Sequence, residues 1–261
     1  MSDPPSADHH YRDARYYDHA YSRYKADLAC YLALAAESGG PVLELGGGTG
    51  RVALALAREG IDVVVVDRMP SMLERARERL AKESAAVRDR IELVLSDVRE
   101  LALGRRFPLV IAPFNVFQHL YTREDFERAL GVARAHLNPG GRLAFDVLLP
   151  DPDALARDPL RFFKHRPVMH PRDRARYAYS EAFEYDPRTQ IQTTVIRFER
   201  LSDGEEVYDR LMQRQFFPRE LEALMHYNGF EVLQHDGGFA GEHLETTTES
   251  QLIVARPRPT P

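Results

Sequence analysis

Glycines are concentrated in one short stretch of the chain, "VLELGGGTGRVA" at residues 42–53. An apolar run that ends in glycines and continues into a helix presents bare backbone N–H groups and a helix N-terminus to a ligand. Side chains are absent from such a turn because a Cβ would block the close approach of that ligand. The stretch therefore predicts a binding site for a nucleotide-like molecule.

Two kinds of ligand fit this turn. Residues 48–53 match the G-x-G-x-x-G/A fingerprint of a dinucleotide site. Glu44 favours the alternative, S-adenosylmethionine (SAM), because a carboxylate at the mouth of the turn repels a pyrophosphate and attracts the ammonium of an amino acid. Asp67 ends the next apolar run, where it can accept both hydroxyls of a ribose in either kind of site. Asp97 ends a third run, where its carboxylate can accept from the exocyclic amine of adenine.

The arrangement "ELGGGTG", "VVVVDRMPSML" and "IELVLSDV" resembles the SAM-binding core of class I methyltransferases, over roughly residues 40–150 and the final strands. The resemblance implies SAM as the cofactor. It also implies that Glu44 supports the loop and binds the methionine amine, and that Asp67 holds the ribose. The other expected cofactor-binding residues are Gly46, Gly48, Gly50, Arg68, Met69, Asp97 and Val98 from the motifs, together with Tyr17 and Phe114.

The stretch "APFNVFQHLYT" follows the fourth predicted strand, and reacting ligands of open α/β sheets lie beyond the carboxyl ends of the central strands. It lacks the N/D-P-P-Y/F signature of DNA amino-methyltransferases and the Pro-Cys pair of the cytosine-ring enzymes. It is similar to the matching segment of small-molecule methyltransferases, including amino-sugar N-methyltransferases, whose histidine is a candidate base. Here that histidine is His119, and we assign Asn115 to catalysis and to substrate binding, and Gln118 to substrate binding.

A base is needed only if the nucleophile arrives protonated, as an ammonium or a hydroxyl. The ordinary pKa of histidine, near 6.5, suits His119 to that role at neutral pH. The alternative is a structural histidine that packs against SAM or caps backbone groups.

Tyrosines recur at helical spacing before the glycine turn and predict one or two amphipathic helices. We expect Tyr21 to take part in catalysis and Tyr17 to help enclose the sulfonium by cation–π contact, although such a stripe can also simply dock a helix. From the later part of the chain, Arg214 is a candidate substrate contact.

Strand-like and helix-like runs alternate up to residue 149, which predicts a parallel sheet with helices on both faces. One of these helices, "SMLERARERLAKE", has Ser71 as its expected N-cap. Beyond Pro150 the pattern changes to a loop with a short helix and then three strand-like runs, separated by the turns "DPRT" and "SDGE". A helix after Pro218 and a closing antiparallel pair of strands complete the chain.

The predicted fold is therefore α/β, with a doubly wound, mostly parallel seven-stranded sheet and a small antiparallel cap insertion. Residues 1–10 are expected to form a disordered tail. Residues 11–149 and 217–261 are expected to form the SAM-binding methyltransferase domain, and residues 150–216 the cap that contributes to substrate binding.

Composition limits the partners. The net charge of −5 in 261 residues argues against nucleic acid and anionic membranes as partners. Cys30 is the only cysteine, which excludes an intramolecular disulfide, an iron–sulfur cluster and a cysteine-based zinc site. The histidines lack metal-ligand spacing, so we predict no metal. Without a signal peptide or a run of about 20 apolar residues, the sequence predicts a cytoplasmic protein.

The sequence thus predicts a SAM-dependent methyltransferase that acts on a nitrogen or oxygen of a small-molecule acceptor, as a monomer or homodimer. Two alternatives remain at this point: an NAD(P)-dependent oxidoreductase, and a SAM-binding subunit without catalytic activity.

Overall fold

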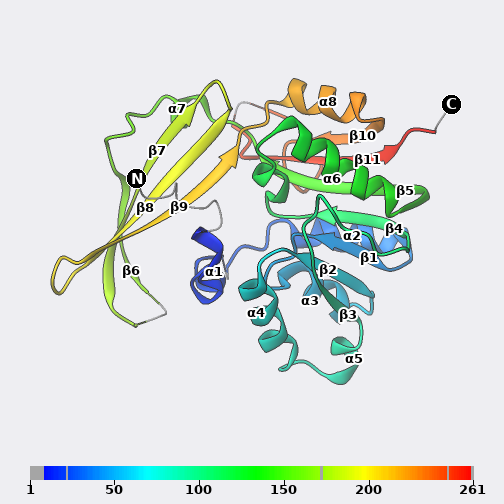
Figure 1. Cartoon of the computed structure of the whole chain (residues 1–261), viewed down its shortest axis with the longest axis horizontal. Coiled ribbons are helices and arrows are strands. Elements are labelled where there is room, and N and C mark those ends of the chain that lie inside the picture. The colour runs from blue at the N-terminus through cyan, green and yellow to red at the C-terminus, as the bar shows by residue number, and fades with distance from the viewer. Residues whose placement is uncertain (1–8, 22, 171–172, 246, 260–261) are drawn as a thin grey trace. The chain divides into compact units, whose positions relative to one another are not determined.

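The structure is a computed structural model that describes residues 9–21, 23–170, 173–245 and 247–259. The chain forms two compact units. The larger unit comprises residues 24–149 and 216–261, and the smaller comprises residues 1–23 and 150–215. Figure 1 shows the elements of both units, coloured from blue at the N-terminus to red at the C-terminus.

In the described part of the larger unit, seven strands form one sheet in the order β10-β11-β5-β4-β1-β2-β3 (Figure 1). The strands are β1 (Val42–Leu45), β2 (Val63–Asp67), β3 (Ile91–Leu95), β4 (Phe107–Ala112), β5 (Leu137–Leu148), β10 (Phe230–Asp236) and β11 (Ser250–Pro257). β1 to β5 run parallel, and β11 is antiparallel to both of its neighbours, β5 and β10. The predicted fold class is confirmed.

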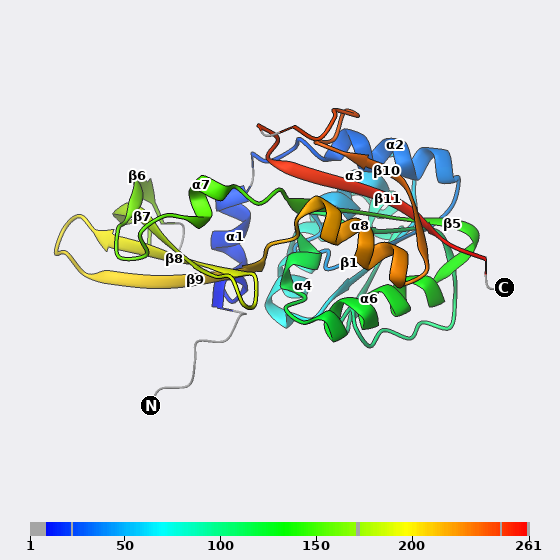
Figure 2. The same cartoon turned by 90° about the horizontal axis from the view of Figure 1, so that it is seen from above.

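Helices cover both faces of this sheet, as a doubly wound topology requires (Figure 2). The helices of the larger unit are α2 (Leu28–Ser38), α3 (Arg51–Arg58), α4 (Pro70–Leu80), α5 (Ala85–Arg88), α6 (Arg123–Ala135) and α8 (Pro218–Tyr227), with the 3-10 helix η2 (Val116–His119). The alternation of side chains along β1 divides the core, because Leu43 and Leu45 pack with residues of α6 and α8 while Val42 packs with residues of α2, α3 and α4.

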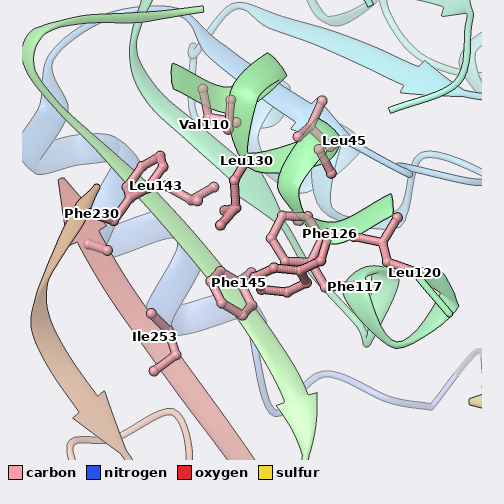
Figure 3. Packing of buried hydrophobic residues seen from close by; sticks show 14 of the residues in the cluster. Leu45, Val110, Phe117, Leu120, Phe126, Leu130, Leu143, Phe145, Phe230 and Ile253 are labelled. Carbon is pink, nitrogen blue, oxygen red and sulfur yellow. The ribbon is translucent and has the colours of Figure 1, made fainter. Parts of the chain in front are cut away.

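Three phenylalanines join the loop after β4 to the core. The ring centroids of Phe117 and Phe145 are 4.5 Å apart, and those of Phe117 and Phe126 are 5.6 Å apart (Figure 3). All three side chains are fully buried. This packing fixes η2, and with it the short segment that carries the predicted substrate residues, against the end of β5.

One predicted helix start is wrong. Ser71 was expected to cap the helix, but α4 begins at Pro70 and Met69 occupies the N-cap position. Proline is favoured at the first helical position because its fixed φ suits the helix and its missing N–H would have no partner there. Ser71 therefore lies inside the first turn.

In the smaller unit, the described strands form an antiparallel sheet in the order β6-β7-β8-β9. Its elements are β6 (Phe163–Met169), β7 (Arg176–Asp186), β8 (Ile191–Arg200), β9 (Glu206–Arg214), α7 (Pro152–Leu155), α1 (Ala14–Tyr21) and the 3-10 helix η1 (His9–Tyr11). The three expected strands are present. β6 was expected to be loop, because its sequence "FKHRPVM" is charged and contains a proline. Edge strands tolerate a proline, and β6 lies at the edge of this sheet.

The segment that leads into the glycine turn belongs partly to this smaller unit. Tyr16 of α1 stacks on His170 at 4.9 Å and meets the edge of Phe198 at 5.2 Å. The predicted boundary at residue 11 therefore differs from the observed grouping, in which residues up to 23 go with the insertion. Two residues of the predicted tail are ordered, since residues 9 and 10 lie in η1 and His10 is 3% exposed. Residues 1–8 of that tail lie outside the described residues.

No helix within the described residues is both long and apolar enough to cross a bilayer. Among the same residues, no group of three or more His, Cys, Asp or Glu side chains could hold a metal ion.

Candidate functional site

The glycine turn joins β1 to α3 and lies at the carboxyl edge of the sheet. Gly46, Gly48 and Gly50 all have left-handed φ values, of 65°, 56° and 77°. A Cβ on Gly46 would lie 2.7 Å from the γ-carbons of Val116, so the turn packs directly against η2. A Cβ on Gly48 would have no neighbour within 4 Å, so this residue borders open space. Strand order reverses between β1 and β4, the place where open α/β sheets bind ligands.

Asp67 ties the glycine turn to the end of β2. Its Oδ2 accepts a hydrogen bond from the N–H of Gly48 at 2.8 Å, and its Oδ1 accepts one from the N–H of Met69 at 2.8 Å. Burial raises the pKa of Asp67 above its ordinary value, while these two backbone donors oppose the rise. A carboxylate has about four lone-pair positions, so these two bonds leave room for the predicted ribose contact.

Glu44 is a buried carboxylate that lacks a full set of partners. Its side chain is 2% exposed, and its Oε2 has no hydrogen-bond partner among the residues that the structure describes. Burial raises the pKa of Glu44 to about 8, although the Arg51 guanidinium acts in the opposite direction. A Cβ on Gly47 would lie 3.0 Å from Glu44 Cδ, so the carboxyl group lies directly at the turn. A ligand ammonium would supply the missing donor and charge, which fits the amino-acid end of SAM.

A buried ion pair supports the start of α3. Arg51 donates to both carboxylate oxygens of Asp27, at 2.6 and 2.5 Å, and Asp27 is fully buried. The Arg51 guanidinium also lies over the rings of Tyr24, at 5.2 Å, and Phe114, at 5.3 Å. Phe114, a predicted cofactor residue, is therefore part of the same cluster as the glycine turn. No sequence pattern predicted the role of Asp27, because its partner is 24 residues away.

The loop after β4 carries the predicted catalytic segment. Phe114 and Asn115 both have φ values of 65°, which is uncommon for residues other than glycine. The carboxylate of Asp146, in β5, accepts from both of their backbone N–H groups and from the hydroxyl of Tyr31. Burial raises the pKa of Asp146 to about 6, while its donors oppose the rise. Neither Asp146 nor Tyr31 was among the residues expected at the site.

Two polar residues of η2 differ in their surroundings. His119 is half-buried, and its Nδ1 lies 3.4 Å from the hydroxyl of Tyr121. Gln118 is fully buried, and its Oε1 accepts from the N–H of Leu148 at 3.4 Å. Gln118 thus ties η2 to β5, and its expected contact with substrate stays a prediction, as does the role of His119.

The predicted adenine site is more exposed than the glycine turn. Asp97 accepts from the guanidinium of Arg99 through both oxygens, at 2.8 and 2.7 Å, and this pairing lowers the pKa of Asp97. Arg99 also donates to Asp125 at 2.6 Å. Near this carboxylate in sequence, Val98 is half-buried and packs on the core, while Arg68 is exposed and Met69 half-buried. The adenine contacts of these residues stay predictions.

The smaller unit contains the other predicted residues: Tyr17, Tyr21 and Arg214. His10 lies between Asp209 and Tyr21, with 2.7 Å from Nδ1 to Asp209 Oδ2 and 3.2 Å from Nε2 to the Tyr21 hydroxyl. His10 was expected to lie in a disordered tail, so this carboxylate–imidazole–phenol chain was not predicted.

Burial, reinforced by Glu181 and Asp209, raises the pKa of Tyr21 to about 12. The ring centroids of Tyr17 and Tyr21 lie 4.8 Å apart, and the Arg214 side chain is buried. Their roles at the site stay predictions.

Comparison with known proteins gives a consistent result. Residues 42–141 match the family described as "Methyltransferase domain". The chain is 33% identical over 131 residues to a demethylmenaquinone methyltransferase of Clavibacter sepedonicus, a match that spans 50% of this chain and only half of that relative's length. It is 30% identical over 228 residues to the cypemycin N-terminal methyltransferase of a Streptomyces species, covering 83% of this chain and 82% of that protein. The structure of the glycopeptide N-methyltransferase MtfA complexed with SAM has a TM-score of 0.63 and 25% identity, covering 92% of this chain and 91% of that chain.

Gly48→Ala tests whether the open space at the turn holds the ligand. A methyl group there should weaken SAM binding on the order of tenfold or more, because it would occupy the ligand's position. Gly140→Ala is the matched control, since Gly140 also has a positive φ, 78°, and open space at its Cβ, but lies near the start of β5. Both variants should lose about 1–2 kcal/mol of stability from backbone strain. Equal SAM affinities of the two variants, measured by calorimetry, would contradict the assignment.

Glu44 makes SAM binding depend on pH. In the free protein its pKa of about 8 keeps the carboxyl group mostly protonated at neutral pH. An ammonium at the turn favours the carboxylate, so binding should release a proton, and affinity should rise up to about tenfold per pH unit between about pH 6 and 7.5. Calorimetry in two buffers of different ionisation enthalpy counts that proton. In Glu44→Gln the affinity should fall and the proton release should disappear; unchanged release would show that another group titrates.

Proposed function

Because the chain belongs to the methyltransferase domain family, as its motifs predicted, we propose that it transfers the methyl group of SAM to a nitrogen of a small-molecule amine. The observation that carries the proposal is the unpartnered, buried Glu44 oxygen at the glycine turn, which a cationic N–H donor of the ligand would satisfy. A pyrophosphate would place negative charge beside this carboxylate. The repulsion between the two groups disfavours the dinucleotide alternative.

Nitrogen is the favoured acceptor atom of the two that the sequence allowed. Both proteins that match most of this chain in the comparisons above are named as N-methyltransferases or N-terminal methyltransferases. One of them acts on a peptide N-terminus by its name and the other on a glycopeptide. A small molecule with a free amino group is therefore the acceptor class that we propose for this chain.

In this proposal three carboxylates of the larger unit hold SAM. Glu44 pairs with its ammonium, Asp67 accepts from its ribose, and Asp97 accepts from its adenine. The remaining contacts come from the turn glycines Gly46, Gly48 and Gly50, from Arg68, Met69 and Val98, and from the aromatic residues Phe114 and Tyr17. When bound, SAM supplies an electrophilic methyl group, so that most of the protein's task is to orient the nucleophile and exclude water.

The acceptor amine reaches the enzyme mainly as an ammonium at neutral pH and must lose a proton to become a nucleophile. We propose that His119 accepts this proton and that Asn115 and Gln118 orient the acceptor. We also assign Tyr21, which is linked through His10 to Asp209, to catalysis, and Arg214 to substrate binding. We further propose that the protein is cytoplasmic and acts as a monomer or homodimer.

A transfer assay tests the function directly. Methyl-labelled SAM is incubated with the protein and a panel of primary amines, amino sugars and short peptides, each paired with its hydroxyl analogue. We expect label in amines and none in the matched alcohols. Binding of SAM without transfer to any acceptor would favour a non-catalytic subunit, and thermal stabilisation by NAD instead of SAM would revive the oxidoreductase.

His119→Ala should lower kcat by on the order of a hundredfold near pH 7 and leave the Kd for SAM within about threefold of the wild-type value. The deficit should shrink as pH rises toward the pKa of the acceptor amine, because more acceptor then arrives deprotonated. His226→Ala is the control, since His226 is exposed in α8 of the same unit. A loss that is independent of pH and accompanied by a lower Tm would instead mark His119 as structural.

A further inference from the structure

Asp146 lies where the chain leaves the sheet toward the candidate site. The last parallel pair between β4 and β5 is Ala112 with Phe145, so Asp146 stands beside the first residues of the loop that follows β4. Its carboxylate is buried and accepts three hydrogen bonds. Oδ1 accepts from the hydroxyl of Tyr31 at 2.6 Å and from the N–H of Phe114 at 2.8 Å, and Oδ2 accepts from the N–H of Asn115 at 3.2 Å.

The two residues whose N–H groups bind Asp146 have an unfavourable backbone conformation. Phe114 and Asn115 are consecutive, and both have a φ of 65°. A residue with a Cβ pays a steric penalty in this region, and a bulky residue such as phenylalanine is rare there. Both N–H groups point to one carboxylate, so these charge-assisted bonds offset the strain.

Tyr31 links this arrangement to helix α2. It belongs to α2, is fully buried, and packs in the core cluster formed by α2, α3 and α4. Burial raises the pKa of Tyr31 well above its ordinary value, so its hydroxyl remains a donor. The position of Asp146 is therefore fixed both by its own strand and by helix α2.

The loop that Asp146 holds presents one unsatisfied acceptor. Asn115 Oδ1 is buried and finds no hydrogen-bond partner anywhere in the described ranges 9–21, 23–170, 173–245 and 247–259. The next residue, Val116, is the one whose γ-carbons would meet a Cβ on Gly46. This amide oxygen thus belongs to a segment in direct contact with the glycine turn. Buried acceptors of this kind normally receive a donor, and a bound ligand can supply it.

We propose that Asp146 and Tyr31 are positioning residues, which hold Phe114 and Asn115 in the left-handed conformation and so fix Asn115 Oδ1 as the acceptor for an N–H of a bound ammonium or amine. The inference rests on the proposed function. The N–H comes either from the acceptor amine or from the amino-acid end of SAM, and the experiment below separates these two sources.

A double-mutant cycle tests whether Asp146 acts through Asn115. Asp146→Asn keeps the shape of the side chain but replaces one of its two acceptor oxygens with an NH₂ donor. One of the backbone N–H groups of the loop then loses its acceptor. Asn115→Ala removes the amide oxygen itself. Each variant should change one constant by on the order of tenfold or more. The double variant should lie within about threefold of the more affected single variant, because the second change has nothing further to remove.

The constant that changes identifies the source of the N–H. A weaker Kd for SAM assigns it to SAM, whereas a higher KM or lower kcat for the acceptor with unchanged Kd assigns it to the acceptor. Either result supports the proposal. Losses that multiply in the double variant, to on the order of a hundredfold, would overturn it. Wild-type constants in Asp146→Asn would overturn it as well.

Two further variants keep the test independent of folding. Leu34→Ala, one turn from Tyr31 in α2, removes buried methyl groups and lowers stability but leaves the bonds of Asp146 in place. It should not change the Kd for SAM or the kinetic constants. If Asp146→Asn does not fold, Tyr31→Phe takes its place in the cycle and should show the same non-additivity with a smaller loss.

Hydrogen exchange separates a failure of this inference from a failure of the proposed function. If the wild-type protein transfers no methyl group, the proposed function fails. Exchange of the amides of Phe114 and Asn115 still decides the positioning role, because it should be faster in Asp146→Asn and unchanged in Leu34→Ala. Unchanged exchange in Asp146→Asn would overturn the positioning role whatever the activity.

Discussion

Buried carboxylates at the carboxyl edge of the sheet constrain the whole candidate site. A carboxylate in the protein interior is costly unless donors surround it, and each of these acids has therefore recruited part of the surrounding chain. Asp67 takes the N–H groups of Gly48 and Met69, Asp27 takes a guanidinium, and Asp146 takes a hydroxyl and two strained N–H groups. Glu44 is the exception, since one of its oxygens finds no donor among the described residues. The need of buried carboxylates for donors therefore determines both the shape of the loops and the charge of the ligand group that the site can bind.

Much of this architecture could be predicted because the signals are local. The apolar runs of β1, β2 and β4 and the glycines between them specify the strands and the turn within a few residues. β6 and the start of α4 were mispredicted for equally local reasons: a charged edge strand resembles a loop, and proline displaced serine from the helix start. The acids Glu44, Asp67 and Asp97 were visible in the sequence, but the partners they would recruit were not.

The residues that the sequence analysis missed are those that act across long separations. Tyr31 and Asp146 are 115 residues apart, and His10 and Asp209 are 199 apart. Nothing near Asp146 distinguishes it from any other acid in a strand, and only the folded chain shows that three donors converge on it. The positive φ values of Phe114 and Asn115 are equally invisible, because neither residue is the glycine that a left-handed conformation normally indicates.

The end of β5 also fixes the points where the chain leaves and re-enters the larger unit. The buried amide of Gln251 donates to the carbonyl of Phe216 at 2.8 Å and to that of Leu148 at 3.5 Å, while Leu148 donates its own N–H to Gln118. The same short segment therefore holds the strained loop, through Asp146, and both connections to the insertion.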